Sequence, residues 1–127
     1  MTKYLAVLLG GGLGAVLRFA VGTLVLKAFT GPFPLGTFLI NITGSFVIGL
    51  LMPFFLSHSS IDPNWRLFIV TGVLGGYTTF SSFEWEAFFT LREGAGFIAI
   101  SYLVLSVVLG LIAVWLGAML AGGIRRW

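Results

Sequence analysis

The sequence predicts an all-α membrane protein with four transmembrane helices, the third of them broken near its middle. Of its 127 residues, 58% are hydrophobic and 9% are charged, and the mean hydropathy is +1.09. A soluble domain normally carries about a quarter charged residues. Four mostly apolar stretches each exceed the roughly 20 residues that a spanning helix needs: Tyr4–Leu26, Leu35–Leu56, Trp65–Leu91 and Phe97–Leu120. Because only short connections remain between them, residues 1–127 are predicted to form one domain.

The first predicted helix, Tyr4–Leu26, has a cluster of small residues in its first half and one charge in its second. Its small residues favour close packing of helices in lipid: Gly10, Gly11, Gly12, Gly14 and Ala15. Arg18 lies within the span, where a charge usually faces the protein interior or a water-filled path. Its positive field would attract anions to one mouth of such a path.

The second predicted helix, Leu35–Leu56, follows a connection with two prolines and carries an asparagine near its middle. Serine and threonine hydroxyls can bond to carbonyls of their own helix, so Thr37, Thr43 and Ser45 are weak signals alone. The Asn41 amide cannot be satisfied in this way so easily. Asn41 is therefore a candidate functional residue, with helix packing as the alternative.

The third predicted helix, Trp65–Leu91, begins after Asp62 and Pro63, a plausible N-cap and first-turn pair. Gly75 and Gly76 lie near its midpoint and would permit a break that frees backbone carbonyls. Free carbonyls at this depth need a partner, and broken helices of transporters use them to bind cations. A simple glycine kink is the alternative.

Two phenylalanines follow this point, one helical turn apart. Phe80 and Phe83 alternate with hydroxyl residues, which is unusual in the middle of a span. The edge of a phenyl ring is electropositive, so ring edges turned toward a pore could hold an anion, with hydroxyls beside them as further donors: Thr79, Ser81 and Ser82. Ordinary aromatic packing is the alternative.

Two acidic residues in the same helix oppose an anion path. Glu84 and Glu86 would repel an anion unless they are protonated, hydrogen-bonded or turned away. Glu84 is expected to face outward, whereas Glu86 is expected to lie just behind the residues that touch the ion.

The fourth predicted helix, Phe97–Leu120, contributes a polar stripe and a small-residue face. Tyr102 and Ser106 are four residues apart and therefore lie on one side of the helix. The small residues on this helix again favour close packing: Ala113, Gly117 and Ala121.

The charges at the helix ends give a weak bias in orientation. One side of the membrane would hold Lys3, Arg66, Arg125 and Arg126, and the other Lys27 and Arg92. So small a difference under the positive-inside rule predicts insertion in both orientations and an antiparallel homodimer in the lipid membrane. The pI of about 9.8 does not indicate nucleic acid, because the basic residues form no patch.

Three motifs resemble those of the small bacterial fluoride channels of the Fluc, or CrcB, family, over the whole chain in length and layout. They are Gly14-Ala15-x-x-Arg18, Gly36-Thr37-x-x-x-Asn41-x-x-Gly44 and Thr71-Gly72-x-x-Gly75-Gly76-x-Thr78-Thr79-Phe80-Ser81-x-Phe83. The resemblance implies a fluoride-selective channel, not an enzyme. Its role would be passive fluoride efflux across the bacterial inner membrane, and hence fluoride resistance.

The resemblance also implies an antiparallel dimer with two separate pores and one structural sodium ion, which is not transported. The backbone carbonyls of Gly75 and Thr78, with those of the partner, would hold the sodium ion. The implied fluoride path comprises Asn41, Phe80, Phe83, Ser106, Tyr102, Thr37 and Arg18. Thr79, Ser81 and Glu86 would support it from behind.

The chain departs from the family pattern on the fourth helix. The family continues the hydroxyl stripe at four-residue steps, whereas this chain has Gly110 and Val114 there.

The main alternative function is a small multidrug-resistance exporter that exchanges protons for cationic drugs. Such exporters rely on a glutamate in the first helix, which here carries Arg18 and no acid. A scaffold subunit would explain the small residues but not the grouping of Asn41, Phe80 and Phe83.

Overall fold

The computed structural model describes residues 2–122, in which all regular secondary structure is helical. Three uninterrupted helices are long and apolar enough to cross a membrane: α1 (Thr2–Ala28), α2 (Leu35–Ser57) and α6 (Gly96–Leu120). The third predicted span consists of four consecutive pieces: α3 (Pro63–Arg66), η1 (Leu67–Leu74), α4 (Gly75–Tyr77) and α5 (Phe80–Arg92). Each span lies within two residues of its predicted bounds. The prediction of four helices with a broken third is therefore confirmed.

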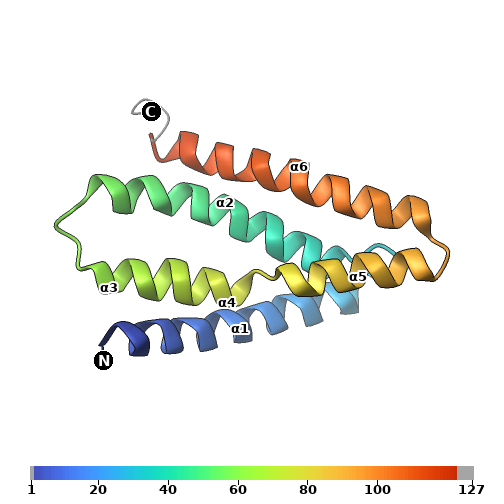
Figure 1. The fold of residues 1–127 in the computed structure, drawn as a ribbon, viewed down its shortest axis with the longest axis horizontal. Coiled ribbons are helices and arrows are strands. Elements are labelled where there is room, and N and C mark those ends of the chain that lie inside the picture. The colour runs from blue at the N-terminus through green and yellow to red at the C-terminus, as the bar shows by residue number, and fades with distance from the viewer. Residues whose placement is uncertain (1, 123–127) are drawn as a thin grey trace.

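The chain runs up and down, so the start of α1 and the end of α6 lie at the same end of the bundle (Figure 1). Lys27 and Arg92 lie in the last turns of α1 and α5, at the opposite end. Arg125 and Arg126, which entered the prediction of orientation, lie outside the described residues.

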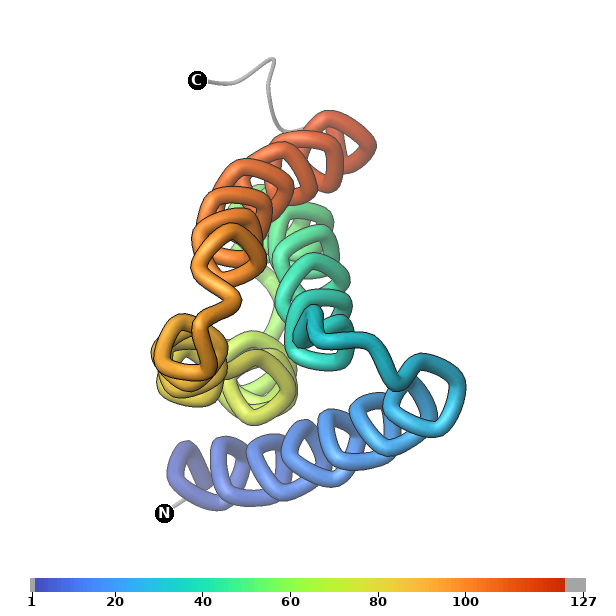
Figure 2. Tube along the Cα trace, turned by 90° about the vertical axis from the view of Figure 1, so that its right-hand side faces the viewer, coloured from blue at the N-terminus to red at the C-terminus, as the bar shows by residue number. Residues whose placement is uncertain are grey.

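The helices form two closely packed pairs. α1 lies along η1 and α4, and α2 lies along α6, while α5 reaches α6 and closes one end of the bundle. Figure 2, viewed along the bundle, shows α6 and α2 on one side and α1 crossing beneath the third span on the other. The polar residues of α2, α5 and α6 therefore meet between the two pairs.

Glycines bring α1 against the third span backbone to backbone. A Cβ atom on Gly10 would overlap the Phe68 carbonyl oxygen, and one on Gly14 would overlap the Val73 carbonyl oxygen. A Cβ on Gly76 would in turn overlap the carbonyl oxygen of α1 residue Gly11. The predicted close packing is confirmed at Gly10 and Gly14, where no side chain would fit, but not at Gly11 and Gly12, where a Cβ would meet nothing within 4 Å.

Glycines also bring the helices of the second pair, α2 and α6, into backbone contact. Cβ atoms on Gly49 of α2 and Gly117 of α6 would overlap the carbonyl oxygens of Val114 and Phe46 respectively. The two helices therefore touch along their backbones toward the C-terminal end of α6.

The start of the third span follows its predicted chemistry, but the turns after it do not. Asp62 caps α3, because its Oδ1 accepts a hydrogen bond of 2.8 Å from the Asn64 N–H, and Pro63 occupies the first turn. The eight residues of η1 then form the wider turns of a π-helix, a geometry that is rare and often found at functional sites.

The break in the third span lies beyond the glycine pair that was predicted to cause it. Gly75 is helical (φ −64°, ψ −35°), whereas Thr78 (ψ 158°) and Thr79 (φ −150°, ψ 127°) are extended. The prediction of a break at Gly75 and Gly76 is therefore wrong in position by about one turn. Gly76 instead serves the contact with α1, and polar partners described below stabilise the extended residues.

Candidate functional site

The side chain of Asn41 on α2 binds the backbone at the break. Its Nδ2 donates to the Thr79 carbonyl oxygen at 3.0 Å, and its Oδ1 accepts from the Thr79 N–H at 2.9 Å. The amide thus satisfies both backbone groups of a residue that has left the helix. Gly44 allows this approach, because a Cβ there would overlap the Thr78 side chain. Each amide atom of Asn41 retains one further hydrogen-bonding position at the break.

The second half of the span starts directly at this junction. Thr79 caps α5, since its Oγ1 accepts a hydrogen bond of 3.3 Å from the Ser82 N–H and donates one of 3.0 Å to Ser82 Oγ. The cap satisfies one of the free N–H groups at the helix N-terminus. Thr79 was expected to lie beside the aromatic rings, and it also fixes where the helix that carries them begins.

Glu86 on α5 connects three helices. Its Oε1 accepts a hydrogen bond of 2.7 Å from Thr37 Oγ1 of α2, and its Oε2 accepts one of 2.8 Å from the Tyr102 hydroxyl of α6. A glutamate could avoid opposing an anion by being hydrogen-bonded or by facing away. Glu86 is hydrogen-bonded, and Glu84 is exposed. The outward placement of Glu84 is confirmed.

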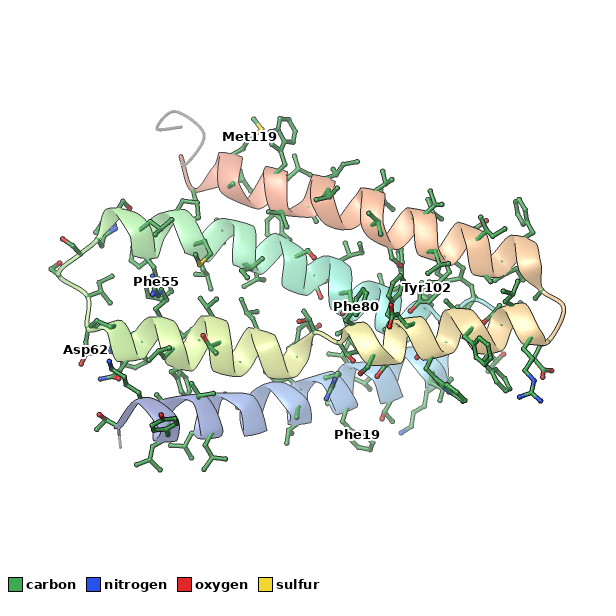
Figure 3. The ribbon with its side chains drawn as sticks, in the orientation of Figure 1. Phe19, Phe55, Asp62, Phe80, Tyr102 and Met119 are labelled. Carbon is green, nitrogen blue, oxygen red and sulfur yellow. The ribbon has the colours of Figure 1, made fainter. Side chains whose placement is uncertain are left out.

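The two phenylalanines differ in their surroundings. Phe83 is 7% exposed and packs edge to face against Tyr102, with ring centroids 5.0 Å apart. Phe80 is 70% exposed, and its centroid lies 5.9 Å from that of Phe83. In Figure 3, Phe80 and Tyr102 lie between α5 and the α2–α6 pair, whereas Phe19 points away from the bundle. Phe83 thus belongs to the aromatic core, while most of the Phe80 ring remains available for contact.

Two cavities meet at the break. The first, of about 540 Å³, lies between α1, the connection before α2, α2 itself and α5, and its lining includes Arg18, Thr37 and Glu86. The second, of about 400 Å³, is lined by residues from α2, η1, α4, α5 and α6, among them Asn41. Thr79 lines both cavities, so the Asn41–Thr79 contact stands between them.

The second cavity gathers most of the remaining predicted site residues. Gly75, Thr78, Phe80, Phe83 and Ser106 all line it. The Ser106 Oγ is buried and has no hydrogen-bond partner among the described residues. An unpartnered hydroxyl next to a cavity is a donor free for a ligand. Ser81 is exposed and lines neither cavity.

The break also leaves backbone carbonyls without partners. In a continuous helix the Gly75 oxygen would accept from the Thr79 N–H, which here binds Asn41. Neither the Gly75 nor the Thr78 carbonyl oxygen accepts a hydrogen bond from any residue between 2 and 122. Such oxygens at membrane depth require a partner from water, an ion or another protein surface.

Comparison with known proteins decides the family. The family model described as CrcB-like protein, Camphor Resistance (CrcB), matches residues 5–118. The chain belongs to the CrcB family.

Relatives of this CrcB chain are similar to it over nearly their full length. A protein of Solibacter usitatus named Fluoride-specific ion channel FluC is 47% identical over 94% of this chain and 98% of its own. Proteins of the same name from Acidobacterium capsulatum and Chloroflexus aurantiacus are 45% and 43% identical, over 96% and 100% of this chain respectively and 98% of each relative. The resemblance found in the motifs is confirmed.

Membership of the CrcB family agrees with the apolar helices. The CrcB chain is a multi-pass protein of the bacterial membrane, and its family is one of ion channels rather than enzymes.

Two connections in this CrcB chain are not evident from the sequence. The pairing of Asn41 with Thr79 joins residues 38 positions apart, and the Glu86 carboxylate joins hydroxyls on two other helices. The signal for the second was present, because a glutamate within a span needs partners. The sequence did not indicate that Thr37 and Tyr102 are those partners.

Proposed function

We propose that this chain forms a fluoride-selective channel through which fluoride leaves the bacterial cell passively. The observation that carries the proposal is the polar contact between Asn41 and Thr79, which lies between two cavities at the break in the third span. The chain that has this contact is closely similar to proteins named Fluoride-specific ion channel FluC. Hydrogen fluoride enters cells as a weak acid and ionises in a neutral cytoplasm, so a passive path for the ion suffices to lower its concentration.

The chemistry of the junction suits a small, strongly hydrated anion. A selective pore must replace the hydration of its ion with closely placed groups of opposite polarity. The free N–H of Asn41, the Ser106 hydroxyl and the positive edge of the exposed Phe80 ring supply such groups. Arg18 at the first cavity adds a positive field that attracts anions.

The test is ion efflux from liposomes that contain the purified protein, with fluoride and chloride compared side by side. We expect rapid fluoride efflux and little chloride efflux, because a larger halide fits the same donors poorly. Equal rates for the two ions, or no fluoride efflux, would exclude the proposal. Nothing favours the multidrug exporter, whose essential glutamate is absent from α1.

We expect the ring edges to contribute directly to fluoride transport. Phe80→Ile and Phe83→Ile should each reduce fluoride efflux several-fold, because an aliphatic side chain is still apolar but lacks a positive ring edge. Phe80→Ile is the cleaner variant, since Phe83 also packs in the aromatic core. Efflux is compared at equal amounts of intact protein, and wild-type rates in both variants would assign the rings to packing alone.

We also propose that two chains pair in opposite orientations. The support is the weak charge bias together with the exposed Gly75 and the unpartnered carbonyls at the break, which a second copy would cover. Reporters of membrane orientation fused to the C terminus should signal from both sides. A strong signal from one side only would contradict the antiparallel pair.

The carbonyls of Gly75 and Thr78 fit a structural sodium ion between two such chains. Two unpartnered carbonyl oxygens from each copy would provide four hard oxygen ligands, the type that broken membrane helices present to sodium. The ion would join the two copies and would not be transported.

Replacing sodium with a bulky organic cation during dimer preparation should lower fluoride efflux, because that cation cannot bind between the carbonyls. The control exchanges the cation only in the external solution after reconstitution. Full efflux after sodium-free preparation would argue against the bound ion.

A further inference from the structure

Ser45 on α2 lies beside the residues assigned to the ion path. It is not part of the three family motifs, and the sequence alone did not assign it a role in the path. It follows Asn41 by one helical turn and therefore shares its face of α2. It lines the second cavity together with Asn41 and Ser106. Its hydroxyl makes no hydrogen bond with any residue between 2 and 122, unlike the hydroxyls of Thr43 and Ser57 on the same helix.

Hydroxyls in a membrane helix are normally satisfied by the carbonyl oxygen one turn earlier. On α2 itself, Thr43 Oγ1 donates to the Leu39 oxygen at 2.7 Å, and Ser57 Oγ donates to the Pro53 oxygen at 2.8 Å. Ser45 lacks such a bond, so its donor remains free toward the cavity. Ser106, across the cavity on α6, has the same property.

Gly110, one turn beyond Ser106, explains why Ser45 matters in this chain. A Cβ on Gly110 would lie 3.7 Å from Ser45 Oγ and 3.9 Å from Ile42 Cδ1, both ordinary contacts. Gly49 and Gly117 in the same helix pair are different, because a Cβ there would overlap backbone oxygens. Packing therefore does not require glycine at 110. The position has room for a methyl group directly beside the Ser45 hydroxyl.

We propose that Ser45 supplies, from α2, the hydroxyl donor that α6 lacks at the level of Gly110. Donors along the second cavity would then run from Asn41 and Ser106 to Ser45, crossing from one helix to the other. Ser45 would donate its hydroxyl hydrogen to fluoride and no bond would be broken. The inference rests on the proposed function and adds a residue to the same path.

The experiment is fluoride efflux from liposomes with Ser45→Ala. We expect a fall of about tenfold, the size of one lost hydrogen bond to an ion. The matched control is Ser57→Ala, which removes a hydroxyl from the same helix at an exposed position bonded to Pro53. It should retain the wild-type rate.

A relocated hydroxyl separates a role in the path from a role in packing. In the Ser45→Ala background, Gly110→Ser places a hydroxyl into the same space from the opposite helix and should restore most of the lost efflux. Gly110→Ala in that background fills the space without a donor and should not. Wild-type efflux in Ser45→Ala, or equal rescue by alanine and serine, would overturn the inference.

Failure of this inference can be distinguished from failure of the proposed function. If the unmodified protein passes fluoride and rejects chloride while Ser45→Ala is unaffected, only the role of Ser45 is excluded. If the unmodified protein passes no fluoride, the proposed function fails before any variant is compared.

Discussion

Replacing Asn41 with aspartate should abolish most fluoride efflux, with a fall of roughly 100-fold, equivalent to about 2.7 kcal/mol. The carboxylate can accept from the Thr79 N–H as the amide does, but it has no hydrogen to donate to the Thr79 oxygen at 3.0 Å. It would also place a negative charge between the two cavities, where it repels an anion. Efflux from liposomes measures the loss.

The control for this variant is a polar residue of α2 that does not bind the extended residues of the break. Thr43→Val removes a hydroxyl that is exposed and bonded within its own helix, apart from a contact of 3.0 Å with the Tyr77 hydroxyl. It should retain most of the efflux. If the aspartate variant transports fluoride at the wild-type rate, Asn41 is not part of the fluoride path.

Replacing Glu86 with leucine should destabilise the protein by about 1–3 kcal/mol, because the hydroxyls of Thr37 and Tyr102 both lose their acceptor. Tyr102 is fully buried, so water cannot readily take the place of the carboxylate. The loss is measured as a lower temperature of thermal unfolding in detergent. Glu84→Leu is the matched control, since Glu84 is exposed in the same helix and should unfold close to the wild-type temperature.

A double substitution tests whether Glu86 and Tyr102 stabilise the protein through their shared hydrogen bond. Tyr102→Phe alone should also lower the unfolding temperature, since it removes the bond of 2.8 Å to Glu86. Added to Glu86→Leu, it should lower the temperature no further, because the acceptor is already gone. Fully additive losses would show that the two side chains act independently.

The sequence was sufficient for features that depend on local pattern. Span lengths follow from continuous apolar stretches, the cap at Asp62 from a short polar motif, and the close packing of α1 from its glycines. The presence of a break was also predictable, because so many small and hydroxyl residues at the centre of a span disfavour a continuous apolar helix.

The sequence was insufficient where distant partners decide the geometry. The glycine pair Gly75 and Gly76 has the conformational freedom to break the helix, but the Asn41 amide stabilises extended residues at Thr78 and Thr79 instead. Gly76 is used for contact with α1, not for bending, and a Cβ on Gly75 would meet only the Val70 carbonyl oxygen, at 3.9 Å. The position of a break is thus set by which residue finds replacement hydrogen bonds, and that depends on a helix 38 residues away in sequence.

The glycine contacts between α1 and the third span also limit how the protein can move. Where main chain touches main chain, no flexible side chain remains between the helices to absorb a shift, so sliding or tilting would force atoms to collide. The η1 and α4 segments, which line the second cavity, are therefore held rigidly against α1. Discrimination between halides by fixed spacing needs such stiffness, because a wall that yielded by a few tenths of an ångström would admit the larger ion as well.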